Sequence, residues 1–442
     1  MGVEPYLLRN SPLLRGNRDK SSSIFSIFIV YILTMDENTR SKFSDLAHQA
    51  MLLPKESFLE VAKKKNSISI GIPKEISFQE KRIALTPLSV ALLVNNGHEV
   101  IIESGAGIGS NFSDRDYSEQ GGQIVPDAES VYKADIIIKV APPTLDEIAF
   151  MKIGQTLISS IQLSSLKASY IKALMAKKVK AISYEYLRDE EGSLTIVRAM
   201  SEIVGATSIL IAAEYLSNPF QGKGLMLGGI TGVAPTEIVI IGAGTVGEFA
   251  ARAAMGLGAQ VKVFDNSLYK LRRLQNNVGQ RVFTSVLQPI VLAKALKRCD
   301  VAIGAMRATE GRSPCIVSEE MVSEMKPDSV IIDISIDQGG CFETSRVTDH
   351  DHPVFRKYDI THYGVPNIAS RVSRTASYVL TNIFTPILLD IGELGGVNDM
   401  LWSKAGVRKG VYIFEGHLTN GHLGELFKIP HKELDLLVAA RG

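Results

Sequence analysis

The sequence has few cysteines and almost no net charge, and each shortage excludes a class of protein. Its three cysteines, at positions 299, 315 and 341, leave one unpaired in any disulfide scheme and show no Cys-x-x-Cys spacing, which argues against a disulfide scaffold and a structural zinc site. The 48 Lys and Arg nearly balance 47 Asp and Glu, so no basic excess exists to bind nucleic acid or anionic lipid. In TDHDHP (348–353), alternating Asp and His is more typical of solvated or capping side chains than of a metal site. We therefore expect a metal-free protein of a reducing compartment, by default the cytoplasm, that acts on small molecules.

Long apolar runs and internal repeats are also missing. The apolar stretch from Ile24 to Leu33 is about ten residues long, whereas a membrane span needs roughly twenty. Basic residues precede it, as in a signal peptide, but no small-residue cleavage site follows. We expect residues 1–66 to be an N-terminal extension, partly disordered, with the natural start at Met35. No repeat of solenoid or propeller length is present.

What the sequence does contain is an alternation of short apolar runs and helical patterns from Ser67 onward. This alternation indicates an α/β protein with parallel strands. The first series of expected strands is SISIGI, HEVIIES, DIIIKV, TLISSI and KAISYE, and the second is EIVIIGAG, QVKVFD, RVFT, DVAIGA and SVIIDIS. The runs are almost wholly apolar, as expected of parallel strands covered on both faces. We predict two doubly wound parallel-sheet domains.

The strongest motif lies in IVIIGAGTVG (238–247), between an expected strand and an expected helix. It has the spacing Gly-x-Gly-x-x-Gly, with Gly242, Gly244 and Gly247. The first glycine permits a tight turn, the second lets the backbone approach a pyrophosphate, and the third lets helix and strand pack closely. The helix that starts with Thr245 and Val246 would direct its N-terminus at the phosphates. The motif predicts a bound dinucleotide.

An acidic residue at the end of the next expected strand favours NAD over NADP. Asp265 follows the motif by about twenty residues, at the distance where a carboxylate accepts hydrogen bonds from the adenosine ribose. It would repel a 2′-phosphate, although Lys270, Arg272 and Arg273 lie close by in sequence. We assign Lys270 to the cofactor site together with Asp265.

From about Ser67 to its C-terminus, the chain resembles the family of alanine dehydrogenases and proton-translocating transhydrogenase alpha subunits. The matching segments are GIPKE, KRIALTP, GHEVIIESGAG, the MSE at 200–202, the glycine motif and IDISIDQGGCFE. Three further segments are closer to alanine dehydrogenase, namely DHP (351–353), YGVPNIASRVSRTASYVLTN (363–382) and YIFEGHL.

The resemblance implies a reaction and a domain arrangement. The reaction is the oxidative deamination of L-alanine to pyruvate and ammonia, with NAD accepting the hydride. Residues 67–196 and 375–442 would form the catalytic domain, and an NAD-binding Rossmann domain, residues 197–374, would be inserted between them. A homo-oligomer, a hexamer in this family, is implied as well.

Four residues match functional positions of the family. Arg82 corresponds to the arginine that holds the substrate carboxylate, a task that suits a planar guanidinium; the alternative is a surface arginine before a helix. Asp337 corresponds to the acid beside the nicotinamide, or else it caps a loop. Ser201 corresponds to a cofactor contact and would also serve as a helix N-cap. Asn367 resembles a cofactor or substrate contact.

At two positions the sequence departs from the family pattern. The family has a lysine where this chain has Ala141, and a histidine where it has Gln162. Lys139 lies two residues before Ala141 and is a candidate substitute, because residues i and i+2 of a strand share a face; a solvated strand-end lysine is the alternative. An amide cannot transfer protons as an imidazole does, and loss of a general acid-base group lowers a rate by about 10²- to 10⁴-fold.

These observations leave more than one function open. The leading hypothesis is an NAD-dependent amino-acid oxidoreductase of the alanine dehydrogenase type, weakened by the two departures. The alternatives are a non-catalytic NAD(H)-binding protein and a transhydrogenase-like nucleotide-binding subunit.

Overall fold

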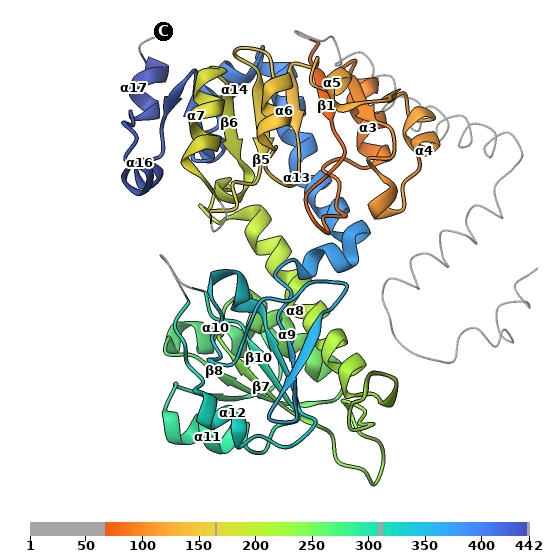
Figure 1. Ribbon diagram of the computed structural model, residues 1–442, viewed down its shortest axis with the longest axis vertical. Helices are drawn as coiled ribbons and strands as arrows, with labels where there is room; N and C mark the ends of the chain where they lie inside the picture. Colours follow the sequence, from red (N-terminus) through yellow and green to blue (C-terminus); the bar gives the residue numbers. More distant parts are fainter. Residues whose placement is uncertain (1–66, 164–165, 308–312, 440–442) are drawn as a thin grey trace, which may run out of the picture. The chain divides into compact units, whose positions relative to one another are not determined.

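The computed structural model describes residues 67–163, 166–307 and 313–439. The expected N-terminal extension, including the apolar stretch and Met35, lies outside these ranges. Within them the chain builds two β-sheets with helices packed around each (Figure 1).

The first sheet has its topological switch point between β1 and β4. Its strands are β1 (Ser69–Ile72), β2 (Glu99–Glu103), β3 (Gln123–Val125), β4 (Ile136–Ile138), β5 (Thr156–Ser159), β6 (Lys180–Ser183), β14 (Val411–Phe414) and β15 (His417–Leu418). They are arranged in the order β15-β14-β6-β5-β4-β1-β2-β3. The chain runs outward from β1 through β2 and β3, then returns to β4 on the other side of β1. Ligands of open α/β sheets bind beyond the carboxyl ends of the strands at such a point.

Helices from both ends of the described chain surround this sheet. They are α3 (Pro87–Asn95), η3 (Ile108–Ser110), α4 (Asp114–Ser118), α5 (Ala128–Val131), α6 (Leu145–Phe150), α7 (Ala168–Ala176), η4 (Tyr184–Tyr186), α13 (Ser373–Leu394), α14 (Val397–Ser403), α15 (Ala405–Arg408), α16 (Gly421–Phe427) and α17 (Leu434–Ala439). Helix α3 begins at Pro87 with extended backbone at Thr86, as a proline at the first helical position favours.

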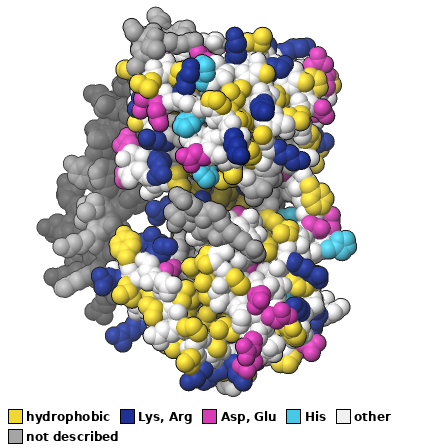
Figure 2. All heavy atoms as spheres, turned by 60° about the vertical axis from the view of Figure 1, so that its left-hand side comes forward, with side chains coloured by type: hydrophobic (Ala, Val, Ile, Leu, Met, Phe, Trp, Pro, Cys, Tyr) yellow, Lys and Arg dark blue, Asp and Glu magenta, His cyan; other side chains and the backbone are white. Residues whose placement is uncertain are grey.

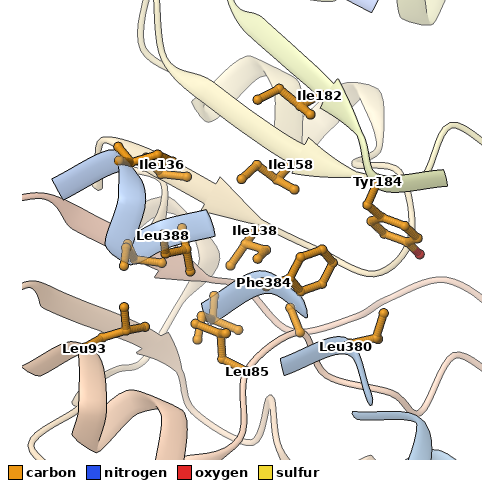
Figure 3. Packing of buried hydrophobic residues seen from close by; sticks show 14 of the residues in the cluster. Leu85, Leu93, Ile136, Ile138, Ile158, Ile182, Tyr184, Leu380, Phe384 and Leu388 are labelled. Carbon is orange, nitrogen blue, oxygen red and sulfur yellow. The ribbon is translucent and has the colours of Figure 1, made fainter. Parts of the chain in front are cut away.

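Helix α13 supplies much of the core on one face of the first sheet. Leu380, Phe384 and Leu388 recur every four residues, which places them on one side of the helix, and all three are at most 1% exposed. Figure 3 shows them packed toward the apolar side chains of β4, β5 and β6. The ring of Tyr184 meets Phe384 edge-on, with ring centroids 5.5 Å apart. Residues more than 200 positions apart therefore share one core, although the predicted domain boundaries stay a prediction.

The second sheet repeats the same winding around β7. Its strands are β7 (Glu237–Ile241), β8 (Gln260–Phe264), β9 (Phe283–Ser285), β10 (Val301–Gly304), β11 (Val330–Asp333), β12 (Val354–Lys357) and β13 (Ile360–Tyr363). Their order is β12-β13-β11-β10-β7-β8-β9, so the switch point falls between β7 and β10. The helical segments of this part are α8 (Thr195–Leu216), η5 (Asn218–Phe220), α9 (Thr245–Gly256), α10 (Leu268–Val278), α11 (Pro289–Leu296), α12 (Glu319–Ser323), η6 (Ile334–Gln338) and η7 (Ile368–Val372).

The predicted α/β class with two largely parallel sheets is confirmed, but the sheet edges are antiparallel. β12 pairs antiparallel with β13, and β14 pairs antiparallel with both β6 and β15. For β12–β13 and β14–β15, tight connections favour such pairing, because an antiparallel neighbour needs no crossover helix.

The surface agrees with the balanced composition. On the face shown in Figure 2, Lys and Arg side chains lie among Asp and Glu side chains over the described residues. This mixture fits the formal net charge of +1.

Helix α8 packs closely on α9, and it is long and apolar enough to cross a bilayer by length and composition alone. Its apolar residues include Ile209, Ile211 and Leu216, which lie in the core of the second sheet. The close approach occurs at Gly205, where a Cβ atom would lie 2.4 Å from the carbonyl oxygen of Val246 and 2.9 Å from the Cβ of Phe249. The α8–α9 contact therefore accounts for part of the apolar character of α8.

A matched pair of glycine substitutions tests this contact. Gly205→Ala should destabilise the folded protein by about 1–3 kcal/mol, because the helices must separate. Gly256→Ala, at the exposed end of α9 where a Cβ meets nothing within 4 Å, should stabilise it by about 0.5–1 kcal/mol. Urea unfolding followed by circular dichroism measures both, and equal effects would contradict the role of Gly205.

Candidate active site

The glycine turn between β7 and α9 has the geometry that the motif predicts. Gly242 has a φ of +116°, and a Cβ there would lie 2.4 Å from the carbonyl oxygen of Ala305 at the end of neighbouring β10. A Cβ on Gly247 would lie 1.9 Å from the carbonyl oxygen of Gly242. A Cβ on Gly244 would meet nothing within 4 Å. The first and third glycines are thus required for packing, and the second leaves its surroundings open to a ligand.

The first turn of α9 is suited to a pyrophosphate. The helix begins at Thr245 and Val246, both half-buried, directly after Gly244. Backbone N–H groups in a first helical turn have no partner within the helix, and the helix dipole favours negative charge there. The open space at Gly244 and these donors fit the diphosphate of NAD.

Asp265 stabilises the glycine turn itself. It lies directly after β8 and is 3% exposed. One carboxylate oxygen accepts a hydrogen bond from the backbone N–H of Ala243 at 2.8 Å, and the other accepts one from Ser267 at 2.7 Å. Each oxygen can accept a second hydrogen bond, so Asp265 keeps the capacity to bind the adenosine ribose. That contact stays a prediction.

Basic side chains flank this turn. Lys270 is exposed in the first turn of α10, where its backbone N–H donates to the hydroxyl of Ser267 at 3.3 Å. Arg273 donates to the carbonyl oxygen of Ala243 at 3.4 Å. The cofactor contact of Lys270 stays a prediction.

The loop after β11 carries two aspartates. Asp333 is buried and accepts hydrogen bonds from the backbone N–H groups of Ser335, Cys341 and Phe342 at 2.9–3.2 Å, so it fixes the IDQGG loop. Asp337 is accessible to solvent. Partial loss of solvent nevertheless raises the pKa of the Asp337 carboxyl, while the Arg307 guanidinium opposes that shift. The sequence interpretation singled out Asp337 and missed Asp333, whose signal was an acid ending an apolar strand.

Ser201 does not cap a helix, and that part of the prediction is wrong. Helix α8 begins at Thr195, six positions earlier, and the Ser201 hydroxyl donates to the carbonyl oxygen of Val197 at 2.7 Å. The glycine-free segment TIVRAM continues the helical pattern upstream of Ser201. A cofactor contact of Ser201 stays a prediction.

Arg82 lies in a buried network rather than on the surface. Its Nε and Nη2 atoms donate to the two carboxylate oxygens of Glu80 at 2.8 and 2.6 Å. Its side chain is 12% exposed, and its Nη1 faces the sulfur of Met200 at 3.7 Å. Glu80 also accepts from the side-chain amide of Asn367 at 3.1 Å. Two residues predicted for the substrate site are thus joined through Glu80, which the sequence interpretation missed although it lies two positions before Arg82.

The electrostatics of this network favour an ionised pair. The Arg82 guanidinium and its hydrogen bonds lower the pKa of the Glu80 carboxyl despite its burial. Arg82 therefore keeps its positive charge beside a carboxylate. Its Nη1 is the guanidinium nitrogen that makes no hydrogen bond to Glu80.

Lys139 is completely buried, so the solvated-lysine alternative is wrong. It follows β4, and its Nζ lies 2.5 Å from Glu147 and 3.9 Å from Glu75. Glu147 also closes the capping box at the N-terminus of α6 with Thr144. The ammonium is committed to these carboxylates, and a direct role as substitute for the family lysine stays a prediction.

Gln162 lies beyond the carboxyl end of β5 in an unusual backbone conformation. Its φ is +46° and its side chain is exposed. Glu185 fixes this turn by accepting hydrogen bonds from the backbone N–H groups of Ile161 and Gln162 at 2.7 and 3.3 Å. The side chain of Gln162 stays a predicted substrate contact.

Models of one protein family match most of the chain. The model described as "Alanine dehydrogenase/PNT, N-terminal domain" matches residues 71–204, and the corresponding "C-terminal domain" model matches residues 208–421. The chain is 40% identical over 362 residues to an alanine dehydrogenase of Mycolicibacterium smegmatis, which covers 82% of this chain and 97% of the relative. It is 38% identical over 351 residues to an alanine dehydrogenase of Bacillus subtilis, covering 79% of this chain and 92% of that one.

Solved structures share the fold. An L-alanine dehydrogenase superposes with a TM-score of 0.77 at 35% identity, covering 82% of this chain and 99% of its own. A transhydrogenase from Sinorhizobium meliloti gives 0.68 at 22% identity, over 80% of this chain and 99% of that one. The second likeness concerns the fold alone.

Two substitutions in the glycine turn separate packing from ligand approach. Gly247→Ala should lower both the stability and the NADH affinity, because its methyl group collides with Gly242. Gly244→Ala should change the melting temperature little but weaken NADH binding about tenfold or more, a cost of roughly 1.4 kcal/mol, because its methyl group enters the space left for the pyrophosphate. Fluorescence titration with NADH and thermal unfolding measure the two effects. Unchanged NADH affinity of Gly244→Ala would contradict the proposed position of the pyrophosphate.

Proposed function

Because the chain belongs to the alanine dehydrogenase/PNT family, we propose that it oxidises L-alanine to pyruvate and ammonia. It is an NAD-dependent oxidoreductase. The amino-acid substrate is inferred from relatives that carry the name alanine dehydrogenase and cover most of this chain. A cytoplasmic location, expected from the cysteine usage, stays a prediction.

One observation carries the proposal, namely the contact between Asn367 and Glu80. Asn367 follows the last parallel strand of the second sheet, whose carboxyl edge also holds the glycine turn and Asp337. Glu80 follows β1 of the first sheet and holds Arg82. Arg82 and Asn367, two predicted site residues that follow strands of different sheets, are thus joined through Glu80.

The residues divide the task by their chemistry. When bound, NAD supplies the acceptor for the hydride that leaves the substrate Cα. Arg82 would bind the substrate carboxylate through Nη1, with Glu80 fixing the plane of the guanidinium. Asp337, with its raised pKa, would lie beside the reacting carbon and stabilise the positive charge of the forming iminium.

The two departures at Ala141 and Gln162 bear on rate. Neither side chain can take up or release a proton near neutral pH. We propose that they slow the alanine reaction or shift its substrate rather than abolish binding of NAD. They also favour the second candidate function, a non-catalytic NAD(H)-binding protein.

A conservative change of Arg82 tests the substrate site. Arg82→Lys keeps the positive charge but loses the planar guanidinium that makes paired hydrogen bonds. The KM for L-alanine should therefore rise about 10- to 100-fold, which is the effect of losing one charge-assisted hydrogen bond. The affinity for NADH should stay the same. Initial rates of NADH formation give the KM, and fluorescence titration gives the NADH affinity. The control is Arg115→Lys, because Arg115 is 84% exposed and its ion pair within the described residues is with the exposed Glu119.

The same assay discriminates the two functions. Tight NADH binding without turnover of L-alanine or any other amino acid would contradict the enzymatic function and favour a non-catalytic NAD(H)-binding protein. Turnover with an unchanged KM in Arg82→Lys would show that Arg82 does not bind the substrate carboxylate.

We further propose a homo-oligomer, with the glycine-dense segment between α8 and β7 as a contact. Met226, Ile230 and Val233 in this segment are 59–67% exposed, and Leu210 on α8 is 58% exposed. Gly228 packs tightly on the last turn of α9, where a Cβ would lie 2.0 Å from the carbonyl oxygen of Leu257. A cluster of exposed apolar side chains on a closely packed segment is typical of a surface that a second copy of the protein covers in an oligomer.

Introducing a charge tests this surface. Ile230→Glu should lower the molecular mass in solution, because a buried carboxylate without a partner disfavours association. Ile290→Glu on α11, at a similarly exposed isoleucine, should leave it unchanged. Sedimentation velocity measures the mass. A monomeric wild type, or an equal mass for the wild type and Ile230→Glu, would contradict the proposal.

A further inference from the structure

Five charged side chains lie buried beyond the carboxyl ends of β1 and β4. Their exposed fractions are between 0% and 12%, and the residues are Glu75, Glu80, Arg82, Lys139 and Glu147. Three carboxylates face two cations, so the fully ionised cluster carries one excess negative charge. Burying an unmatched charge is costly. The cluster therefore favours uptake of one proton or of one positively charged group.

Glu75 is the member with the weakest compensation. Glu80 is held by Arg82 and Asn367, and Glu147 by Lys139 and the N-terminus of α6. The described contacts of Glu75 are two backbone N–H groups and the more distant Lys139 at 3.9 Å. Burial raises the pKa of the Glu75 carboxyl to about 7, although Lys139 and the backbone bonds oppose the shift.

Glu75 contacts the backbone at the position where the family resemblance predicts a lysine. Its carboxylate accepts hydrogen bonds from the backbone N–H groups of Val140 and Ala141 at 2.5 and 3.2 Å. Ala141 replaces the lysine expected from the family resemblance and brings no ionisable group of its own. Arg82 is close enough for its charge to interact with Glu75. A buried carboxyl group therefore lies against the backbone of Ala141 and within the electrostatic range of Arg82.

We propose that Glu75 accepts the proton that the substrate's ammonium group loses before the Cα hydride departs. An O–H bond forms on the Glu75 carboxylate and one N–H bond of the substrate breaks. The electron pair stays on the nitrogen, which becomes a neutral amine able to form the iminium. This inference rests on the proposed amino-acid oxidation and adds the group that takes over proton transfer in the absence of a histidine at position 162.

The surroundings of Glu75 set the sign of its pH dependence. Lys139 and Arg82 favour its ionised form, whereas Glu80 disfavours it. Glu147 from α6 faces Glu75 across Lys139. Tyr132 from the end of α5 also faces the cluster, and burial and the nearby carboxylates raise its pKa so that it stays neutral.

Because the pKa of Glu75 is raised from 4.5 to about 7, the carboxyl is protonated and unable to accept a proton below that value. Alanine oxidation should therefore fall as the pH drops through about 7. The same shift makes this group stabilise the fold at acidic pH, and that contribution is lost as the pH rises through the folded pKa.

Glu75→Gln removes the acceptor while keeping the shape of the side chain. It should lower kcat for L-alanine about 10²- to 10⁴-fold, change KM little, and abolish the ionisation near neutral pH. Glu75→Asp should restore part of kcat with a shifted ionisation. Glu99→Gln, at an exposed glutamate of β2, is the matched control. An unchanged kcat or an unchanged pH profile in Glu75→Gln would overturn the proposal.

A measurement without turnover separates this proposal from the proposed function. Infrared difference spectra recorded as the pH is raised should show one carboxylic acid ionising near neutrality in the wild type and in Glu99→Gln but not in Glu75→Gln. If no such band is present, Glu75 does not hold the proton, even when L-alanine is oxidised. If the band is present and no amino acid is oxidised, the substrate assignment fails while the proton-holding carboxyl stands.

Discussion

The ion pair between Arg82 and Glu80 is the interaction on which the arrangement of the site depends. A guanidinium buried to 12% exposure needs a partner, and the fork-to-carboxylate geometry supplies two hydrogen bonds at 2.6 and 2.8 Å. Glu80 in turn accepts from Asn367, 287 positions later in the chain. The segment after β1 is thereby tied to the segment that enters α13, which itself packs on β4 and β5. The stability of the first core and the orientation of Arg82, the predicted substrate-binding arginine, are coupled through this one carboxylate.

The features that could be predicted from the sequence are those with a local physical cause. The glycine turn follows from three glycines within six residues, each required for its own steric reason. In the structure, a Cβ at Gly242 or Gly247 would collide with a backbone carbonyl oxygen. The start of α3 at Pro87 follows from the fixed φ of proline. The antiparallel edges β12–β13 and β14–β15 were missed, because short strands joined by tight turns lack the long apolar runs of the buried strands.

The site was harder to predict because its partners are distant in sequence. Arg82 could be recognised as a candidate, but its pairing with Glu80 and the link to Asn367 come from the fold. Ser201 was misplaced at a helix start because serine is a good N-cap in general; the helix extends to Thr195 instead. For Lys139 the sequence left two interpretations open, a substrate contact and a solvated side chain at a strand end. Glu147, which caps α6, brings a carboxylate to its ammonium and excludes only the second.

The charges near Arg82 bear on the predicted departures from the family pattern at Ala141 and Gln162. In a site with a free lysine and a histidine, cations would attract the substrate carboxylate and an imidazole would move the proton. In this chain Lys139 is internal and pairs with Glu147, and Gln162, where the resemblance predicts an imidazole, carries an amide. The buried carboxylate of Glu75 beside Ala141 makes the local charge negative. It therefore attracts the ammonium group of an amino acid and repels its carboxylate. The rate of amine deprotonation would then depend on the protonation of Glu75, and recognition of the substrate carboxylate on Nη1 of Arg82, the nitrogen that Glu80 does not engage.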